Sequence, residues 1–259
     1  MTLRALIIGT SHAAALRLAW RDHAADWPAL TLTFAALQGD VADLRLTGPQ
    51  LVARDDDARA RLLQVSGQDQ FDVTRFDVIA LCGGTASGFH ALRLYNLARC
   101  AALPSAARPL DQGLSLLSTD CFVTAMTGLI RSASALPLLR ALAAVTPARL
   151  FAIPHPGLSA DVLRGSKQHV GFARMARNGD APALSDLLQQ ATRRAYDGIA
   201  TPIPAPDAVR VDGFFTHRRF RRGATRLGVD DDVAQPGDDL LHGNADYGRH
   251  ILTALAAHI

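Results

Sequence analysis

Residues 3–12 of the chain read LRALIIGTSH, and this stretch sets the expected architecture. Its apolar run ends at Gly9, and an Ala- and Leu-rich stretch with helical spacing follows over residues 13–22. The pattern predicts a buried strand, a tight turn and a crossover helix. Ligands of open α/β sheets bind beyond the carboxyl ends of the strands, and Ser11 falls there. Helix N-terminal N–H groups at such a place stabilise developing negative charge, so Ser11 is a candidate nucleophile. The alternative is that Ser11 only caps the helix.

Strand-like and helical stretches alternate along the rest of the chain. Four further stretches have the composition of strands: residues 30–37, 76–85, 149–153 and 198–204. Helical composition is found in these stretches: residues 111–145, with a break near 132–137, residues 181–196 and residues 244–257. Strands that alternate with helices predict a parallel, doubly wound sheet with right-handed crossovers. We therefore expect one domain over residues 1–259, a flavodoxin-like three-layer α/β/α fold around a central five-stranded parallel sheet.

Three connecting segments have their own patterns. Residues 49–53 and 61–65 flank the acidic triplet at 55–57 and predict a small peripheral β-hairpin. Residues 154–157, Pro-His-Pro-Gly, predict a rigid turn that forms part of a cleft wall. Residues 206–237 are poor in periodicity, and a connection of this length often borders a binding site.

Composition and charge exclude several classes of protein. Of the 259 residues 49% are hydrophobic and 20% charged, which is ordinary for a globular domain. No apolar run approaches the roughly 18 residues of a membrane span, and the N-terminus does not resemble a signal peptide. The net charge is only +3, so we expect no nucleic-acid partner. The basic run at 217–222 is interpreted as a solvated face, with attraction of an anionic substrate as the alternative.

The three cysteines are Cys82, Cys100 and Cys121, an odd number without metal-ligand spacing. They predict reduced thiols and a cytoplasmic location. No pattern indicates a metal or another cofactor, and none indicates the oligomeric state.

A second polar cluster lies near the C-terminus. Residues 237–244 read GDDLLHGN, with Asp239 and His242 three positions apart just before the last helix. This spacing lets the carboxylate accept a hydrogen bond from one imidazole nitrogen, while the other nitrogen stays free to take a proton. These are the orienting acid and the base of a serine hydrolase, with Ser11 as nucleophile. The alternative is a surface Asp in a helix-capping loop.

Taken together, the motifs resemble the SGNH (GDSL-like) hydrolase family over nearly the whole chain. They are Gly-x-Ser-His at 9–12, glycine turns at Gly39 and Gly84, and Asp-x-x-His at 239–242. Residues 242–248, HGNADYG, also resemble the segment that follows the catalytic histidine in bacterial SGNH-like proteins. The α/β-hydrolase elbow Gly-x-Ser-x-Gly is not matched, because position 13 is Ala13.

The resemblance implies roles for individual residues. Ser11 matches the nucleophile, His242 the base and Asp239 the orienting acid. The backbone N–H groups of Ser11 and Gly39 match two donors of an oxyanion hole. The third donor of the family is an Asn side chain after the third strand, and Thr85 stands at that position here.

A hydroxyl reaches less far than an amide, and loss of one such donor lowers turnover by about 10²–10³. Asn96 is therefore a further candidate donor from a nearby helix. Gly84, Asn96 and His155 are the residues expected to line the pocket.

The expected function is that of a serine esterase or deacetylase, which cleaves a small acyl or acetyl ester through an acyl-enzyme. Its partner is then a small-molecule ester. Two alternatives use the same residues. One is a non-catalytic or weakly active SGNH-like module that binds a carbohydrate or metabolite, which Thr85 favours. The other is an acyltransferase that passes the acyl group to an alcohol instead of to water.

Overall fold

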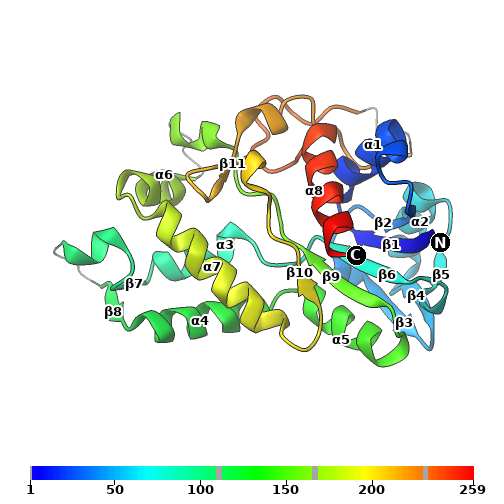
Figure 1. Cartoon of the computed structure of the whole chain (residues 1–259), viewed down its shortest axis with the longest axis horizontal. Helices are drawn as coiled ribbons and strands as arrows, with labels where there is room; N and C mark the ends of the chain where they lie inside the picture. Colours follow the sequence, from blue (N-terminus) through cyan, green and yellow to red (C-terminus); the bar gives the residue numbers. More distant parts are fainter. Residues whose placement is uncertain (1, 109–112, 165–168, 230–232) are drawn as a thin grey trace.

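The computed structural model describes residues 2–108, 113–164, 169–229 and 233–259 (Figure 1). Its centre is a five-stranded parallel sheet with the order β10-β9-β6-β1-β2. The strands are β1 (Leu3–Gly9), β2 (Leu30–Ala36), β6 (Val78–Cys82), β9 (Arg149–Ile153) and β10 (Thr201–Pro202). Numbered along the chain, these strands lie in the order 2-1-3-4-5, which is the flavodoxin-like arrangement. The predicted fold class is confirmed.

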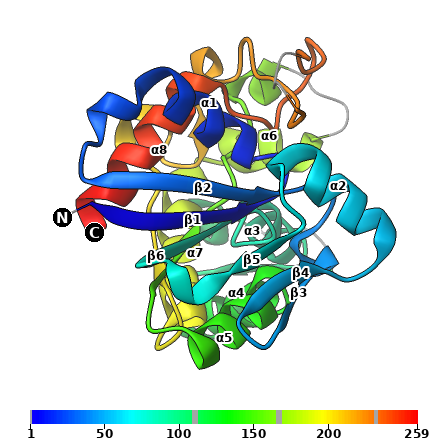
Figure 2. The ribbon, with the colours of Figure 1, turned by 90° about the vertical axis from the view of Figure 1, so that its right-hand side faces the viewer.

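Helices cover both faces of the sheet (Figure 2). On one face, α1 (Ala13–His23) and α8 (Ala245–His258) pack against each other. The opposite face carries α3 (Gly88–Tyr95), α4 (Thr119–Arg131), α5 (Ala135–Val145) and α7 (Ala181–Tyr196). Two more helices, α2 (Asp56–Ser66) and α6 (Val170–Arg177), lie toward the periphery.

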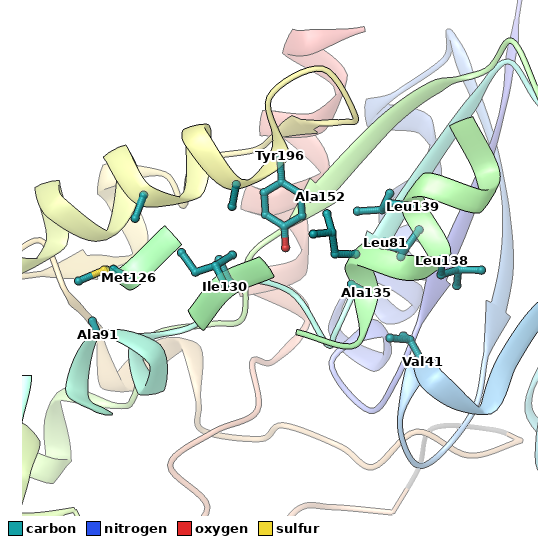
Figure 3. Packing of buried hydrophobic residues seen from close by; sticks show 14 of the residues in the cluster. Val41, Leu81, Ala91, Met126, Ile130, Ala135, Leu138, Leu139, Ala152 and Tyr196 are labelled. Carbon is teal, nitrogen blue, oxygen red and sulfur yellow. The ribbon is translucent and has the colours of Figure 1, made fainter. Parts of the chain in front are cut away.

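The first strand explains why the sheet needs cover on both faces. Ala5 and Ile7 join the apolar cluster beneath α1 and α8, whereas Leu6 and Ile8 join the cluster on the other face. All four side chains are fully buried. A strand buried on both faces is a continuous apolar run, which is the pattern in the sequence. Figure 3 shows part of the larger cluster, including Leu81 and residues of α4, α5 and α7.

The predicted hairpin is partly wrong. Residues 49–53 do form a strand, but the small antiparallel sheet has three strands: β3 (Leu44–Thr47), β4 (Gln50–Ala53) and β5 (Gln70–Asp72). Residues 61–65 belong to helix α2. The cause is Asp55, whose carboxylate accepts from the Ala58 N–H at 2.8 Å and so caps this helix. The two acidic residues after it stand in the first turn, where the helix dipole favours negative charge.

The other predicted elements hold with small changes. The break in the helical segment falls between α4 and α5, near residues 132–134. Residues 115–117 are strand β8 (Ser115–Leu117), which pairs with β7 (Ala98–Cys100), and 111–112 lie outside the described residues. The segment after residue 206 contains a short hairpin, β11 (Arg210–Val211) and β12 (Phe215–Thr216).

Within the described ranges no single helix is long and apolar enough to cross a membrane. Helices α4 and α5 meet that test only as a pair, and the pair is bent by 73°.

Gly248 sets the distance between α1 and α8. A Cβ at this position would overlap the backbone carbonyl group of Ala15 and lie 2.9 Å from the Leu16 nitrogen. We expect Gly248→Ala to lower the free energy of unfolding by about 3 kcal/mol or more, because backbone atoms of a packed helix cannot move aside. Gly128→Ala in α4 is the matched control, since nothing lies within 4 Å of its Cβ position. That change should stabilise by about 0.5–1 kcal/mol. Urea unfolding measures both, and equal effects of the two changes would contradict this packing.

Candidate active site

Ser11 lies in the turn between β1 and α1, at the carboxyl edge of the sheet. The preceding residue, Thr10, donates its N–H to the Cys82 carbonyl at the end of the neighbouring β6, at 3.0 Å. This edge, between β1 and β6, is where the strand order reverses, which is the usual ligand position in such sheets. Helix α1 begins after His12 and has no side-chain cap. The capping alternative for Ser11 is therefore not what the structure shows.

The Ser11 hydroxyl instead meets the C-terminal cluster. Ser11 Oγ lies 2.9 Å from His242 Nε2, although the two residues are 231 positions apart. His242 Nδ1 lies 3.1 Å from Asp239 Oδ1. The side chains of His242 and Asp239 are 19% and 12% exposed, so the group is sheltered but open to a small molecule. The structure thus brings together the three residues that the sequence selected.

The Asp239 carboxylate is held by the loop itself. It accepts the His242 N–H at 3.0 Å and the Leu241 N–H at 3.3 Å, in addition to the imidazole contact. These backbone bonds fix the orientation of the carboxylate. With Asp239 as the acceptor, the imidazole proton lies on Nδ1, which leaves Nε2 as the acceptor facing Ser11.

Asn244 ties this loop to the segment before it. Its side-chain oxygen accepts the Tyr247 N–H at 3.0 Å and so caps α8. Its amide nitrogen donates to the carbonyl groups of Arg219 and Arg222, each at 2.9 Å. One side chain therefore fixes the start of α8, the His242 loop and residues 219–222 together.

Two changes at Asn244 separate these roles. Asn244→Ser keeps a cap oxygen and loses both amide donors, whereas Asn244→Ala loses all three bonds. We expect Asn244→Ala to lower the free energy of unfolding by about 1 kcal/mol more than Asn244→Ser, the usual value of a cap. Both should lower kcat/KM of a reaction that depends on the Ser11–His242 pair by about tenfold, because small displacements of a reacting group are costly. Wild-type kcat/KM in both variants would show that Asn244 does not position His242.

Arg221 is a buried cation beside the site that the sequence did not reveal. Arg221 is only 6% exposed, and its guanidinium group donates a hydrogen bond to the Gly157 carbonyl. Burial lowers the pKa of Arg221 to about 10, opposed by the nearby Tyr247 and Asp239. The group thus stays protonated at neutral pH and places a positive charge near Asp239. The basic run at 217–222 is therefore not wholly a solvated face.

Three imidazole rings adjoin one another at the site. The His12 ring centroid lies 4.5 Å from that of His155 and 5.0 Å from that of His242. Burial lowers the pKa of His12 well below its usual value, with His155, His242 and Arg221 adding to the effect. Burial likewise lowers the pKa of His155 to about 4, helped by His90 and His242 and opposed by Asp40. Both rings are neutral at pH 7, so they pack beside His242 without charge.

The pKa of His155 leads to an expected acid sensitivity. Near pH 5 the unfolded chain protonates this ring and the folded protein does not, so the unfolded state takes up more protons. Stability therefore falls as the pH drops from about 6.5 toward 4. We expect His155→Gln to reduce the loss of unfolding free energy between pH 7 and pH 5 by about 2 kcal/mol. Urea unfolding at both pH values measures it, with His258→Gln at the exposed end of α8 as control. An unchanged loss in His155→Gln would contradict the neutral, buried ring.

The two backbone N–H groups that are expected to be oxyanion donors are those of Ser11 and Gly39. Within the described part of the chain, no hydrogen bond is found for the N–H of Ser11 or of Gly39. Gly39 has a φ of +128°, and a Cβ there would meet the side chains of Arg61 and Asp43. The turn after β2 therefore requires glycine, which leaves its backbone open to a ligand.

The expected third donor is already engaged. The Thr85 hydroxyl donates to the Ile153 carbonyl at 2.6 Å, and Thr85 is 1% exposed. A hydroxyl has one proton, so Thr85 does not donate to a ligand while this bond persists. Asn96 does not replace it. Asn96 lies at the C-terminal end of α3, whereas the site is at the N-terminal end of this helix, where Ser87 is found, and the Asn96 side-chain oxygen accepts a hydrogen bond from Arg174 at 2.6 Å. The predicted placement of Asn96 at the site is wrong.

A cavity of about 280 Å³ lies beside His155, and Ser11, Asp239 and His242 are not among its lining residues. His155 lines it, as expected, together with residues 154 and 157 of the predicted cleft wall. Gly84 and Asn96 do not line it. Residues 210 and 213–216 of the long segment do, which agrees with the expectation that this segment borders a binding site.

Comparison with known proteins adds little to these observations. No protein-family model and no curated protein matches the sequence. A phospholipase A1 from Streptomyces albidoflavus NA297 has a similar structure, at 13% identity and a TM-score of 0.43 over 100% of both chains. A DUF4886 family protein from Bacteroides uniformis ATCC 8492 is similar at 10% identity and a TM-score of 0.34, over 100% of this chain and 94% of that chain. At these scores neither likeness indicates a function.

Proposed function

We propose that this chain is a serine hydrolase of the esterase or deacetylase type, acting on a small acyl or acetyl ester. The observation that carries the proposal is the series of contacts at the carboxyl edge of the sheet. Ser11 Oγ lies 2.9 Å from His242 Nε2, and His242 Nδ1 lies 3.1 Å from Asp239. Nucleophile, base and orienting acid within hydrogen-bond reach are the arrangement that nucleophilic acyl transfer requires.

The reaction begins with attack of Ser11 Oγ on the ester carbonyl carbon. The hydroxyl proton passes to His242 Nε2, and Asp239 stabilises the imidazolium that forms. The carbonyl oxygen becomes an oxyanion, to which the N–H groups of Ser11 and Gly39 donate. When the C–O bond to the alcohol breaks, the leaving oxygen takes the proton from His242 and an acyl-Ser11 ester remains.

Water completes the cycle by the same steps. His242 removes a proton from the water as its oxygen attacks the acyl carbon. The second tetrahedral intermediate collapses, Ser11 Oγ regains a proton from His242, and the carboxylic acid leaves. An alcohol in place of the water gives acyl transfer instead of hydrolysis.

Turnover of p-nitrophenyl acetate tests the proposal. We expect steady release of p-nitrophenol preceded by a burst of up to one equivalent, the sign of an accumulating acyl-enzyme. Product analysis with added glycerol separates hydrolysis from transfer, because transfer gives glyceryl acetate instead of acetate. No release above the uncatalysed rate for acetyl, butyryl and hexanoyl esters would contradict the proposal.

One observation favours a second candidate, a binding module of low or no activity. The Thr85 hydroxyl is bound to Ile153, so only two oxyanion donors are identified. Loss of one donor lowers kcat by about 10²–10³ and leaves the nucleophile reactive. The two candidates differ in the burst, which a weak enzyme gives and a binding module does not.

A further inference from the structure

The cavity beside His155 is mainly apolar, is open on one side and is lined by elements from several parts of the chain. It lies between α7, the loop that precedes α3, the ends of β9 and β10, and the hairpin β11–β12. Its apolar surface comes from side chains such as Leu188, Ile203, Phe214 and Phe215. Its volume of about 280 Å³ is near the lower end of small-molecule pockets, which begin at about 300 Å³. The space suits a short hydrocarbon group.

His155 connects the cavity to Ser11. The residue lines the cavity, and its ring contacts His12, the residue after the nucleophile. Strand β9, which ends just before His155, lies two positions from β1 in the sheet. Neighbouring strands are about 4.8 Å apart, so the two strand ends are separated by about 10 Å. A chain of about eight carbon atoms attached to a carbonyl at Ser11 spans that distance.

The charged residues that line the cavity are Arg193 and Arg210, and Arg210 is paired with Asp207. None of the lining residues described is Asp or Glu. Arg193 is exposed on α7. Arg210 is held by Asp207 and by the Gly213 carbonyl. An apolar space with guanidinium groups and no carboxylate in its wall is complementary to a ligand with an apolar body and a negative end.

We propose that this cavity holds the acyl group of the substrate, and that this group is a short hydrocarbon chain that ends in an anionic group such as a carboxylate. The inference rests on the proposed esterase function. The acyl group is the part that stays attached to Ser11 through both steps, so an apolar cavity that adjoins His155 suits it. The alcohol must leave and water must enter on the side of His242, which is partly open to solvent.

Three p-nitrophenyl esters test the fit: the acetate, the octanoate and the monoester of suberate, which has the same chain length as the octanoate. Each buried methylene should raise kcat/KM by about fourfold, so the octanoate should exceed the acetate by at least tenfold once two methylenes are buried. The suberate monoester should exceed the octanoate by about threefold, because its carboxylate adds a negative charge in a cavity whose charged lining residues are Arg193 and Arg210. Equal kcat/KM for the acetate and octanoate would overturn the apolar site, and an octanoate preferred over the suberate would overturn the anionic end.

Two pairs of variants on α7 locate the effect. Arg193→Gln should abolish the preference for suberate, whereas Arg194→Gln, its neighbour outside the cavity, should retain it. Leu188→Trp should lower the ratio of octanoate to acetate turnover at least tenfold by filling the cavity. Gln190→Trp, which is exposed on the same helix, should leave that ratio unchanged. Equal behaviour within either pair would overturn the assignment to this cavity, as would a dependence on the chain length of the alcohol in alkyl acetates instead.

Binding of octanoate to the Ser11→Ala protein, measured by calorimetry, separates the two proposals. If no ester is turned over but octanoate binds and Leu188→Trp weakens the binding at least tenfold, the hydrolase proposal fails and the cavity remains a site for an anionic amphiphile. If esters are turned over and octanoate does not bind, the hydrolase proposal stands and this inference fails.

Discussion

Ser11→Ala is expected to lower kcat for p-nitrophenyl acetate by about 10⁴-fold or more. The variant removes the only atom that the mechanism allows to attack the carbonyl, while the backbone donors of Ser11 and Gly39 remain. Those donors and substrate binding leave some acceleration over water, so the residual rate should be small and without a burst. Stopped-flow and steady-state release of p-nitrophenol measure both quantities.

Ser115→Ala, at an exposed position of β8, is the control and should keep full activity. Urea unfolding of Ser11→Ala should give nearly wild-type stability, since only the contact to His242 is lost. A Ser11→Ala protein that is folded and retains a tenth or more of the wild-type kcat would show that another group performs the attack.

Asp239→Asn is expected to lower kcat by about 10³–10⁴-fold. The amide keeps the size of the carboxylate but presents an N–H group, so it favours the imidazole tautomer with its proton on Nε2, facing Ser11. It also removes the charge that stabilises the imidazolium. Asp238→Asn is a matched control, because the adjacent Asp238 is exposed and takes no part in the contacts of His242.

The pH profile distinguishes a catalytic effect from a disturbed loop. In Asp239→Asn the remaining activity should rise steeply with pH as hydroxide replaces the lost base, whereas a merely loosened loop would lower activity equally at all pH values. Activity of Asp239→Asn within tenfold of wild type would remove Asp239 from the proposed mechanism.

The sheet could be predicted from the sequence because its strands are buried on both faces. A continuous apolar run such as the one in β1, ended by a glycine, has few other interpretations. Residues 61–65 were misassigned because their apolar and polar residues fit either a strand or a helix. Only the cap at Asp55 decides between the two, and its bond to the Ala58 N–H is a local contact that composition does not show.

At the site, the sequence indicates the three triad residues because their positions in the chain form recognisable local motifs. Asp239 and His242 are close in the chain, and Ser11 follows a strand that ends in glycine. Arg221 was missed because a basic run on its own is usually solvated, and its burial depends on the contact with Gly157 from a distant segment. Thr85 could be located but not its hydroxyl bond to Ile153, which depends on the register between β6 and β9.

Labelling with a fluorophosphonate, followed by peptide mass spectrometry, tests the proposed nucleophile and its base together. The account predicts one adduct per chain, located on Ser11, with a labelling rate at least a hundredfold lower in His242→Asn. An adduct on another residue, no adduct at any pH between 6 and 9, or an equal rate in His242→Asn would contradict it.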